Sequence, residues 1–514
     1  MKILISSGKN MVVNPSISKK VKPMSTIINQ ALYLPKRWGL PPEAIASLGD
    51  RLQNTWARYR DCFKTKTRDS GEHAWVYLRG LLEMKTGRNY ANIARRVSDA
   101  GQDQDGQNLQ QFMSDSPWDA QAVIQKVQQE IVETPGLQHG GVLLLDESAD
   151  EKAGPKSAGA GRQFNGRLGK IEMSQVGVFL AFYKDVVWTW VDGELFLPEH
   201  WFTPEMAHER KRVGVPEHRH FATKIQLGWR MIQRVKTQGL PFEAVACGDL
   251  YGRSGWFRSQ VAQAGILYMA EVPEDTQIYL SKPDFGIPPH VQGQAGRFHT
   301  RPKVMSEDQP VEVRQLIAFP ETHFQRFPVR DTERGELDDR FAMRRIWTIC
   351  EDELAEEWLV IRHENDQRYT YALSNAPAET AQERLAWLKC VRHFVERSNQ
   401  DAKSEIGWDE LQAQKYRAWE HHLAMTIMAT WFIAQTKYDW TNTYTRDPKL
   451  AGEFELNTLP ALSVANVREL LQATMPLPQL SPDQATQLVV KHLVNRSRAS
   501  RSRHKSHLKK RSST

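Results

Sequence analysis

Three acidic residues stand where their side chains could share divalent metal ions. Asp146 follows the apolar run GVLLL, and Asp249 follows a second apolar run, AVACG. Functional groups gather at the carboxyl ends of strands in an α/β sheet, so two such aspartates can converge if their strands are neighbours. Glu396 lies four residues after Arg392 and seven before Lys403. The pattern predicts a site built from two aspartates and a glutamate.

The chemistry that such a set supports is metal-assisted phosphoryl transfer. Two Asp and one Glu can hold a pair of Mg²⁺ ions about 4 Å apart, and Mn²⁺ can substitute, because hard cations prefer carboxylate oxygens. One ion would lower the pKa of an attacking water or 3′-hydroxyl, and the other would stabilise the leaving oxygen. At about 100° per residue, Arg392, Glu396 and Lys403 point roughly the same way on one helix, with Asn399 alongside. The Arg and the Lys would then lie near phosphates.

Each of these residues also has an ordinary structural interpretation. An Asp at a strand end is commonly a turn residue or a helix cap, and a helical Arg–Glu–Lys stripe is commonly a solvated face. Glu147, Asp150 and Glu151 lie close to Asp146 in the chain. Adjacent strand residues point to opposite faces, so Glu147 should diverge from Asp146. The other titratable residues in these segments are expected to be surface charges or helix-surface and core residues rather than ligands: Asp192, Glu194, His393, His421 and His422.

Two sets of elements precede and position these residues. After an irregular segment (1–35), apolar residues at three- and four-residue spacing predict an all-helical N-terminal domain over 36–138. Its last helix is expected to open at Ser116-Pro117 as cap and first turn. From Gly140 the period changes: GGVLLLDES is typical of a strand buried on both faces, and QVGVFLAFY and VVWTWVDGELFL predict a hairpin joined by Lys184-Asp185.

The remaining pattern predicts an α/β core that is interrupted once. A helix ended by Gly239, the strand FEAVACGD and a further helix and strand complete residues 139–273, which predicts a mixed sheet flanked by helices. Frequent Pro and Gly with short strand-like runs predict a β-rich insertion over 274–378. Helical patterns return over 379–440, with Leu385, Leu388, Val391 and Val395 as the packing stripe of the helix that carries Glu396. A helical region (441–490) and a basic tail (491–514) follow.

Composition excludes several classes of protein. The chain has 514 residues, 40% hydrophobic and 25% charged, which predicts a soluble protein of several structural units. No apolar run approaches the roughly 18 residues of a membrane span, and the N-terminus lacks a signal-peptide pattern, so a cytoplasmic location and no membrane partner are expected. The four cysteines are far apart and form no CxxC pair, so they are expected to be reduced and mostly buried.

The charge distribution is uneven. From Lys491 to Thr514 the chain carries nine Lys or Arg and no acidic residue, so the net charge of +7 divides into about −2 for the body and +9 for the tail. Such a tail cannot bury an apolar face and is expected to be disordered when free. It is either a solubilising terminus or a non-specific arm that binds phosphates.

One long segment, LLLDESADEKAGPKSAGAGRQFNGRLGKIEMSQVGVFLAFY from Leu143 to Tyr183, resembles a known family. It is similar to the DDE-type transposases of bacterial insertion sequences, specifically the branch called insertion sequence family 701. The resemblance extends from about Trp56 to Lys437 and includes YLRGLLEMKTGRNYANIA, LFLPEHWF, RKRVGVPEHRHFATK and CGDLYG. It implies a ribonuclease H-like fold with Asp146 and Asp249 as the first two catalytic carboxylates.

The same resemblance implies the third carboxylate. The family carries a Tyr-Arg-Glu-Lys signature spaced Y-x2-R-x3-E-x6-K, which Arg392, Glu396 and Lys403 match in type and spacing. The Tyr position is Lys389 here, which leaves the metal ligands unchanged but removes any phosphate contact made by the Tyr. Basic residues of RQFNGRLGK and of later segments become candidates for phosphate contacts, although the former also fits an ordinary polar loop: Arg162, Arg167, Lys170, Lys211, Arg212, Lys224, Arg330 and Arg345.

The function that the resemblance implies is magnesium-dependent cut-and-paste DNA transposition. The N-terminal domain would bind the terminal inverted repeats of double-stranded DNA, and the core would cleave at the element's ends and join them to target DNA. A homodimer on DNA and a nucleoid-associated location are implied, because two ends need two active sites. Two other hypotheses stay open: an inactive DNA-binding regulator of transposase origin, and a metal-dependent nuclease that cannot transfer strands.

Overall fold

A computed structural model of the chain describes residues 30–98, 106–166, 168–289, 299–332, 335–364, 368–456, 459–477 and most of 481–501. The predictions for residues 1–29, for Arg167 and for the end of the basic tail (502–514) lie outside the described residues. In the part of 481–501 that is described, the residues are helical and exposed, which differs from the disordered tail predicted from composition.

Helices fill the N-terminal region, as the sequence predicts. They are α1 (Pro42–Ala46), α2 (Leu48–Tyr59), α3 (Gly71–Glu83), α4 (Tyr90–Val97), α5 (Gln107–Ser114) and α6 (Ala120–Glu133). The start of α6 was predicted wrongly. Asp119, not Ser116, is the cap, because its carboxylate accepts the backbone N–H of Gln121 at 2.9 Å and satisfies a donor that the first helical turn leaves open.

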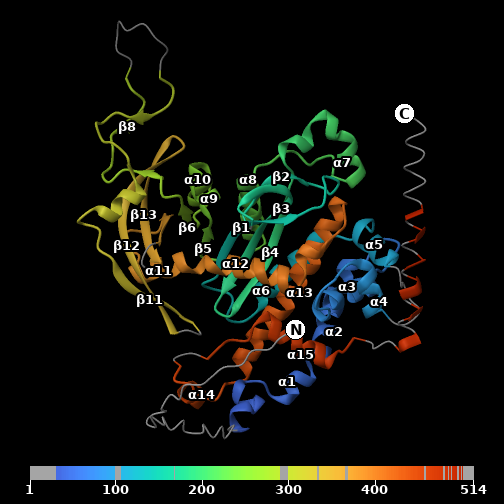
Figure 1. The fold of residues 1–514 in the computed structure, drawn as a ribbon. Coiled ribbons are helices and arrows are strands. Elements are labelled where there is room, and N and C mark those ends of the chain that lie inside the picture. The colour runs from blue at the N-terminus through green and yellow to red at the C-terminus, as the bar shows by residue number, and fades with distance from the viewer. Residues whose placement is uncertain are drawn as a thin grey trace, which may run out of the picture.

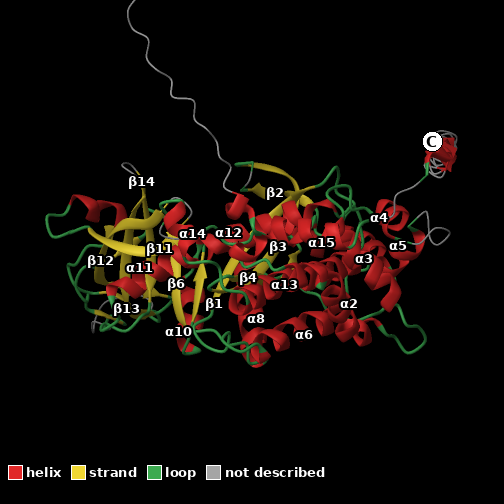
Figure 2. Cartoon of the chain, turned by 90° about the horizontal axis from the view of Figure 1, so that it is seen from below, coloured by secondary structure: helices red, strands yellow, loops and turns green. Residues whose placement is uncertain are grey.

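A mixed sheet crosses the molecule, with helices on both faces (Figures 1 and 2). Its first strands are β1 (Val142–Glu151), β2 (Gly161–Asn165), β3 (Lys170–Lys184), β4 (Val187–Phe196), β5 (Ala244–Cys247) and β6 (Leu267–Val272). β3 is antiparallel to β1 and to β4, whereas β5 is parallel to both β1 and β6. The predicted hairpin is confirmed, with Asp185 at a φ of 52° in the turn between β3 and β4.

The β-rich stretch is not separate from this sheet. Its long strands are β11 (Gln325–Thr332), β12 (Gly335–Cys350), β13 (Glu353–Glu364) and β14 (Arg368–Ser374). They extend the sheet in the order β11-β12-β13-β14-β6-β5-β1-β3-β2, because β14 pairs with β6. A second, smaller hydrophobic core, which includes Ile278, Leu316 and Leu359, covers this half of the sheet. The short strands of the same stretch lie outside that order: β7 (Gln277–Ile278), β8 (Phe285–Gly286), β9 (Lys303–Val304) and β10 (Val311–Glu312).

Helices cover the faces of the sheet and connect it to the N-terminal region. They are α7 (Ala207–Val213), α8 (Lys224–Thr237), α9 (Asp249–Gly252), α10 (Gly255–Gln263), α11 (Gln382–Val391), α12 (His393–Gln400), α13 (Tyr416–Thr443), α14 (Lys449–Glu453) and α15 (Val464–Thr474). α13 is buried nearly all round and contacts α3, α5, α6 and β4. The N-terminal helices and the sheet therefore share one hydrophobic core through α13.

Two acidic residues differ from their predicted surface positions. Asp192 is fully buried and Glu194 is mostly buried, because both lie in β4, the second strand of the hairpin, where α8 packs against that strand. Arg234 of α8 pairs with both carboxylates, at 2.8 Å to Asp192 and 3.0 Å to Glu194. The four cysteines are free as predicted, with Cys62 partly exposed and the others buried. None of the described helices is both long and apolar enough to cross a membrane.

His421 and His422 are buried core residues in α13, and they make folding sensitive to acid. Burial lowers the pKa of His421 to about 4 and that of His422 to about 3. His422 donates from Nε2 to the carbonyl of Trp408 at 3.1 Å and accepts from the Tyr77 hydroxyl at Nδ1 at 2.9 Å, a pattern that requires the neutral ring.

Because both folded pKa values lie below the unfolded value, their contribution is complete above about pH 6.5 and is lost as pH falls toward 4 and then 3. We expect the free energy of unfolding to fall over this window by about 3 kcal/mol through His421 and about 5 kcal/mol through His422, measured by urea denaturation. His422→Gln, which keeps a donor and an acceptor, should flatten part of this decline. An unchanged slope in the variant would contradict the assignment.

Candidate active site

Two adjacent parallel strands position the two aspartates. Leu145 of β1 lies opposite Cys247, the last residue of β5, so Gly248-Asp249 follows the end of β5 beside Asp146, which lies within β1. A Cβ atom at Gly248 would lie 3.8 Å from Asp146 Oδ1, which places the start of α9 directly against Asp146. Asp249 is the exposed first residue of α9. The expectation that Asp146 follows a strand end is wrong, because β1 continues past it to Glu151, paired with β3. That Asp146 and Asp249 share one site stays a prediction.

Arg392 connects Asp146 to the helix that carries Glu396. Its Nη1 lies 4.0 Å from Asp146 Oδ2, and its Nη2 donates to Glu396 Oε1 at 2.8 Å. The Glu396 side chain is 58% exposed. One guanidinium therefore faces two of the three predicted carboxylates, and it supplies the positive charge that balances them.

A third acidic residue on this guanidinium, Glu271 of β6, escaped the sequence analysis. Its carboxylate forms ion pairs with Arg392, whose Nε lies 2.5 Å from Oε2, and with Lys389, whose side chain is 1% exposed. Burial alone would raise the pKa of Glu271, but Lys389 and Arg392 outweigh it and the pKa is lowered. A glutamate within the apolar run ILYMAEVP was the signal that could have revealed it. Lys389, the residue at the signature Tyr position, therefore has a buried partner of its own.

The neighbouring carboxylate Glu147 points to the opposite face of the sheet, as predicted. It lies 3.4 Å from Lys224 of α8, whereas Asp146 faces Arg392 beside α12. Lys224, a predicted DNA contact, is thus in an ion pair in this structure, and its ammonium also lies over the Phe196 ring. The two adjacent carboxylates have different partners and different surroundings.

The helix that carries the signature is not continuous. α11 and α12 meet at Arg392, and a π-helical turn, η8 (Asp401–Glu405), follows α12. Lys403 in that turn lies 2.7 Å from Asp150 and donates to the carbonyl of Ala149 at 2.9 Å. Asp150 and Asp146 are four residues apart on β1 and share a face, so Lys403 fastens η8 to the same face that Arg392 meets. A phosphate contact by Lys403 stays a prediction.

Burial dominates the electrostatics of Asp146. It raises the pKa of Asp146 to about 7, while Arg392 acts in the opposite direction and Glu147 adds to the rise. The backbone N–H of Glu147 donates to Asp146 Oδ1 at 2.9 Å and favours the charged form. A second positive charge nearby would stabilise the ionised form of Asp146 and lower its pKa.

The three predicted carboxylates are of the type that binds a hard divalent cation, but they do not converge on one point in this structure. Asp146, Asp249 and Glu396 offer the carboxylate oxygens that such ions prefer. Within the described ranges, no three His, Cys, Asp or Glu side chains are close enough together to hold a metal ion. To share an ion with the two aspartates, the Glu396 side chain must turn toward Asp146, and it has room to do so because it is exposed.

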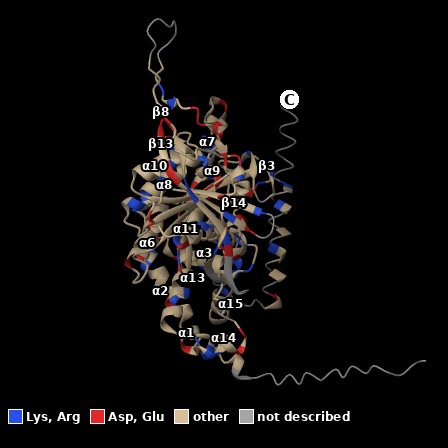
Figure 3. Cartoon of the chain, turned by 90° about the vertical axis from the view of Figure 1, so that its left-hand side faces the viewer, with Lys and Arg blue, Asp and Glu red and all other residues tan. Residues whose placement is uncertain are grey.

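The predicted DNA contacts lie in different settings. Arg162 is exposed on β2, and Lys170 on β3 pairs with Glu172 at 3.1 Å. Arg345 pairs with Glu356 and lies over the Trp358 ring, and the side chain of Arg330 lies outside the described ones. Over the described chain, Lys and Arg are interspersed with Asp and Glu rather than gathered on one side (Figure 3).

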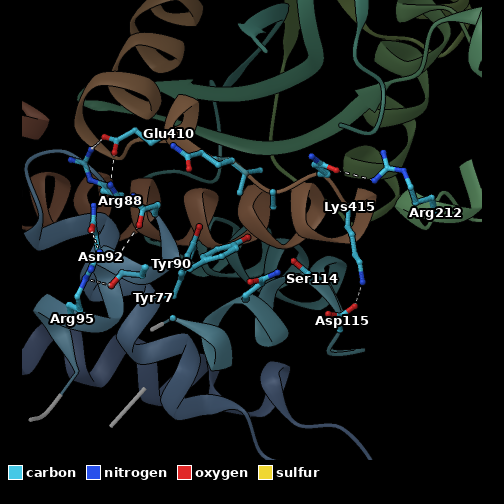
Figure 4. A pocket seen from close by; sticks show the side chains of 18 residues that line it. Tyr77, Arg88, Tyr90, Asn92, Arg95, Ser114, Asp115, Arg212, Glu410 and Lys415 are labelled. Carbon is cyan, nitrogen blue, oxygen red and sulfur yellow. Dashed lines mark hydrogen bonds and ion pairs between the residues drawn. The ribbon is translucent and has the colours of Figure 1, made fainter. Parts of the chain in front are cut away.

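A cavity of about 740 Å³ lies away from these carboxylates, between α3 to α5 and the segment before α13 (Figure 4). Arg88 on its wall pairs with Glu410 at 2.7 Å, Lys415 pairs with Asp115, and Arg212 donates to Gln414 at 2.9 Å. These contacts join the N-terminal helices to the core. The cavity is therefore a structural junction whose charges are already matched.

The chain matches a family model described as DDE superfamily endonuclease over residues 58–336, slightly more than half its length. That range includes Asp146 and Asp249 and ends before Glu396. The chain is also similar to the probable transposase for insertion sequence element IS701 of Microchaete diplosiphon. The two are 24% identical over 320 residues, which cover 60% of this chain and 69% of the relative.

Among solved structures, the chain matches the cryo-EM structure of the piggyBac transposase synaptic complex with hairpin DNA. The match covers 89% of this chain and 84% of the other, with 11% identity and a TM-score of 0.29. A TM-score of this size does not establish a shared fold.

Proposed function

The chain belongs to the DDE superfamily endonucleases, and from this premise we propose that it is an insertion-sequence transposase that cleaves DNA at the element's ends and joins them to target DNA. The observation that carries the proposal is the position of Arg392, which faces Asp146 and Glu396 together, beside the strand end that leads into Asp249. A partly buried aspartate that faces a guanidinium is suited to a site that handles phosphates.

In this proposal Asp146, Asp249 and Glu396 hold divalent cations, for which we propose a pair of Mg²⁺ ions that Mn²⁺ can replace. Such ions supply the activation of an attacking oxygen and the stabilisation of a leaving one. Arg392 orients Asp146 and Glu396 toward each other, and Lys403 keeps η8 and the preceding α12 on the face of β1. The enclosed position of Asp146 strengthens each of these electrostatic interactions.

We also propose the predicted domain organisation. The order β4-β3-β1-β5-β6, with an antiparallel meander followed by two parallel strands, supports a ribonuclease H-like core. The second hydrophobic core supports treating 274–378 as an insertion on that sheet. The helices of 36–138 would bind the terminal inverted repeats, and two copies would act on two ends, which calls for a homodimer on DNA.

The proposal is tested with paired oligonucleotides that carry the element's two ends and a supercoiled target plasmid, in Mg²⁺. We expect cleaved ends and joined products. Cleavage without joined products would favour a nuclease that cannot transfer strands. Binding without cleavage, in Mg²⁺ and in Mn²⁺, would favour an inactive regulator. Either result would overturn the proposal.

A further inference from the structure

The hairpin formed by β2 and β3 exposes an apolar pair at its end. Phe164 and Ile171 lie directly opposite each other in the register of the two strands. Their exposed fractions are 61% and 57%, and Leu168 in the turn is also exposed. Cross-strand aromatic and β-branched pairs usually stabilise a sheet by being covered, so an uncovered pair at a hairpin tip indicates a contact with another molecule.

This apolar pair lies on the same face of the sheet as Asp146. Asp146 is opposite Phe179 in the β1–β3 register, and β3 runs without a register shift against β1 and β2. Alternate residues of a strand share a face, so Ile171 lies on the Phe179 face, and so does its partner Phe164. The hairpin therefore lies on the same side of the sheet as Asp146, beyond a buried stretch of β3 that packs against Trp408 and Trp419.

The separation along that face is set by strand geometry. Eight residues of β3 separate Phe179 from Ile171, which corresponds to about 26 Å at a rise of about 3.3 Å per residue. Between them, Lys403 is fixed on Asp150. A DNA strand whose scissile phosphate lay at Asp146 would reach the hairpin after roughly eight nucleotides of about 3.4 Å each.

The charges on this face favour a nucleic acid as the partner. The hairpin residues that share it are Arg162, Phe164, Ile171 and Met173, and Arg162 is exposed. No carboxylate belongs to this set, because Glu172 points to the other face with Lys170. A flat apolar surface beside a cation matches a base and its phosphate, and stacking on an aromatic ring is tolerant of sequence.

We propose that Phe164 stacks on a nucleobase of the DNA bound at Asp146, about eight nucleotides from the scissile phosphate, with Ile171 behind the ring and Arg162 at the adjacent phosphate. This proposal rests on the proposed function, since it takes the position of the DNA from Asp146. It assigns the hairpin to unstacking or holding a base, a role separate from the chemical step.

The test is photo-crosslinking of the full chain to end duplexes that carry 5-iodouracil at successive positions, with the crosslinked residue identified by mass spectrometry. We expect a crosslink to Phe164 confined to positions near the eighth nucleotide. Phe164→Ala should remove it and weaken DNA binding by about tenfold, whereas Phe164→Tyr should retain both. The unfolding temperature of each variant should match that of the wild type, because the side chain is exposed.

Matched controls separate the possible results. Phe454→Ala removes another exposed ring (43%), which directly follows α14, and α14 lies far from the β2–β3 hairpin (Figure 1); this variant should leave the crosslink intact. Asp146→Asn should crosslink like the wild type, so a failure of the proposed chemistry would leave this result unaffected. Wild-type binding by Phe164→Ala with no crosslink at Phe164 in any duplex would overturn the proposal. The proposal would also be overturned if light scattering showed that Phe164→Ala loses dimers that the wild type forms without DNA. That result would assign Phe164 and Ile171 to a contact with a second copy of the chain.

Discussion

Asp146→Asn protein is expected to bind the element's ends at wild-type affinity and to cleave them at less than about a thousandth of the wild-type rate. The substitution keeps the shape of the side chain and the acceptor for the N–H of Glu147. It removes the negative charge that Arg392 faces and that the proposed cations need. Metal-assisted stabilisation is worth several kcal/mol, and each 1.4 kcal/mol or so changes the rate tenfold. Single-turnover cleavage in Mg²⁺, with binding measured in parallel, gives both numbers.

Glu147→Gln is the matched control for this experiment. It removes a charge from the next residue of the same strand, on the face that meets Lys224 rather than Arg392. Cleavage should stay within about twofold of wild type, because an ion pair at a partly exposed position contributes only about 0–1 kcal/mol. Cleavage by Asp146→Asn at the wild-type rate would remove Asp146 from the active site.

Glu271→Gln is expected to destabilise the chain by about 3 kcal/mol and to slow cleavage by about ten- to a hundredfold. Loss of this carboxylate leaves the buried ammonium of Lys389 unpaired, which is costly in a low-dielectric interior. It also removes the negative charge that pairs with Arg392 at Nε, and the loss of such supporting contacts typically lowers activity by that factor. Urea denaturation and single-turnover cleavage measure the two effects.

The double variant Glu271→Gln/Lys389→Met separates stability from orientation. Removing both charges should restore most of the free energy of unfolding, because no buried charge is left without a partner. Cleavage should stay low, because Arg392 still lacks the carboxylate charge that pairs with its Nε. Recovery of both quantities together would show that Glu271 contributes only to folding, and the assignment of a positioning role would be wrong.

Strand ends and spacing predicted much of the candidate site. Asp249 follows the short buried strand β5 as predicted, whereas Asp146 lies within β1, which continues to Glu151; the parallel pairing of β1 with β5 still places the two residues beside each other. The pairing of Arg392 with Glu396 follows from their i,i+4 spacing. These contacts join residues that are close in the chain or lie on one pair of adjacent strands. Sequence patterns can therefore predict them.

Contacts between distant segments could not be predicted in the same way. Lys389 and Glu271 are more than a hundred residues apart, and nothing in the helical pattern indicates that they meet. The π-helical turn that places Lys403 against Asp150 departs from 3.6 residues per turn, so helical spacing in the sequence does not predict it. The joining of the β-rich stretch to the main sheet depends on hydrogen bonds between β14 and β6, which alternation alone does not specify.

That junction has a mechanical consequence. Ala372 of β14 lies opposite Glu271 of β6, so the last strand of the β-rich stretch is hydrogen-bonded to the strand that holds Arg392 through Glu271. A sheet is stiff along its hydrogen bonds, and a load applied to β11 through β14 reaches Glu271 through a chain of paired strands without crossing a flexible linker. A displacement of the β-rich half of the sheet would therefore be transmitted through paired strands to the carboxylate that pairs with Arg392.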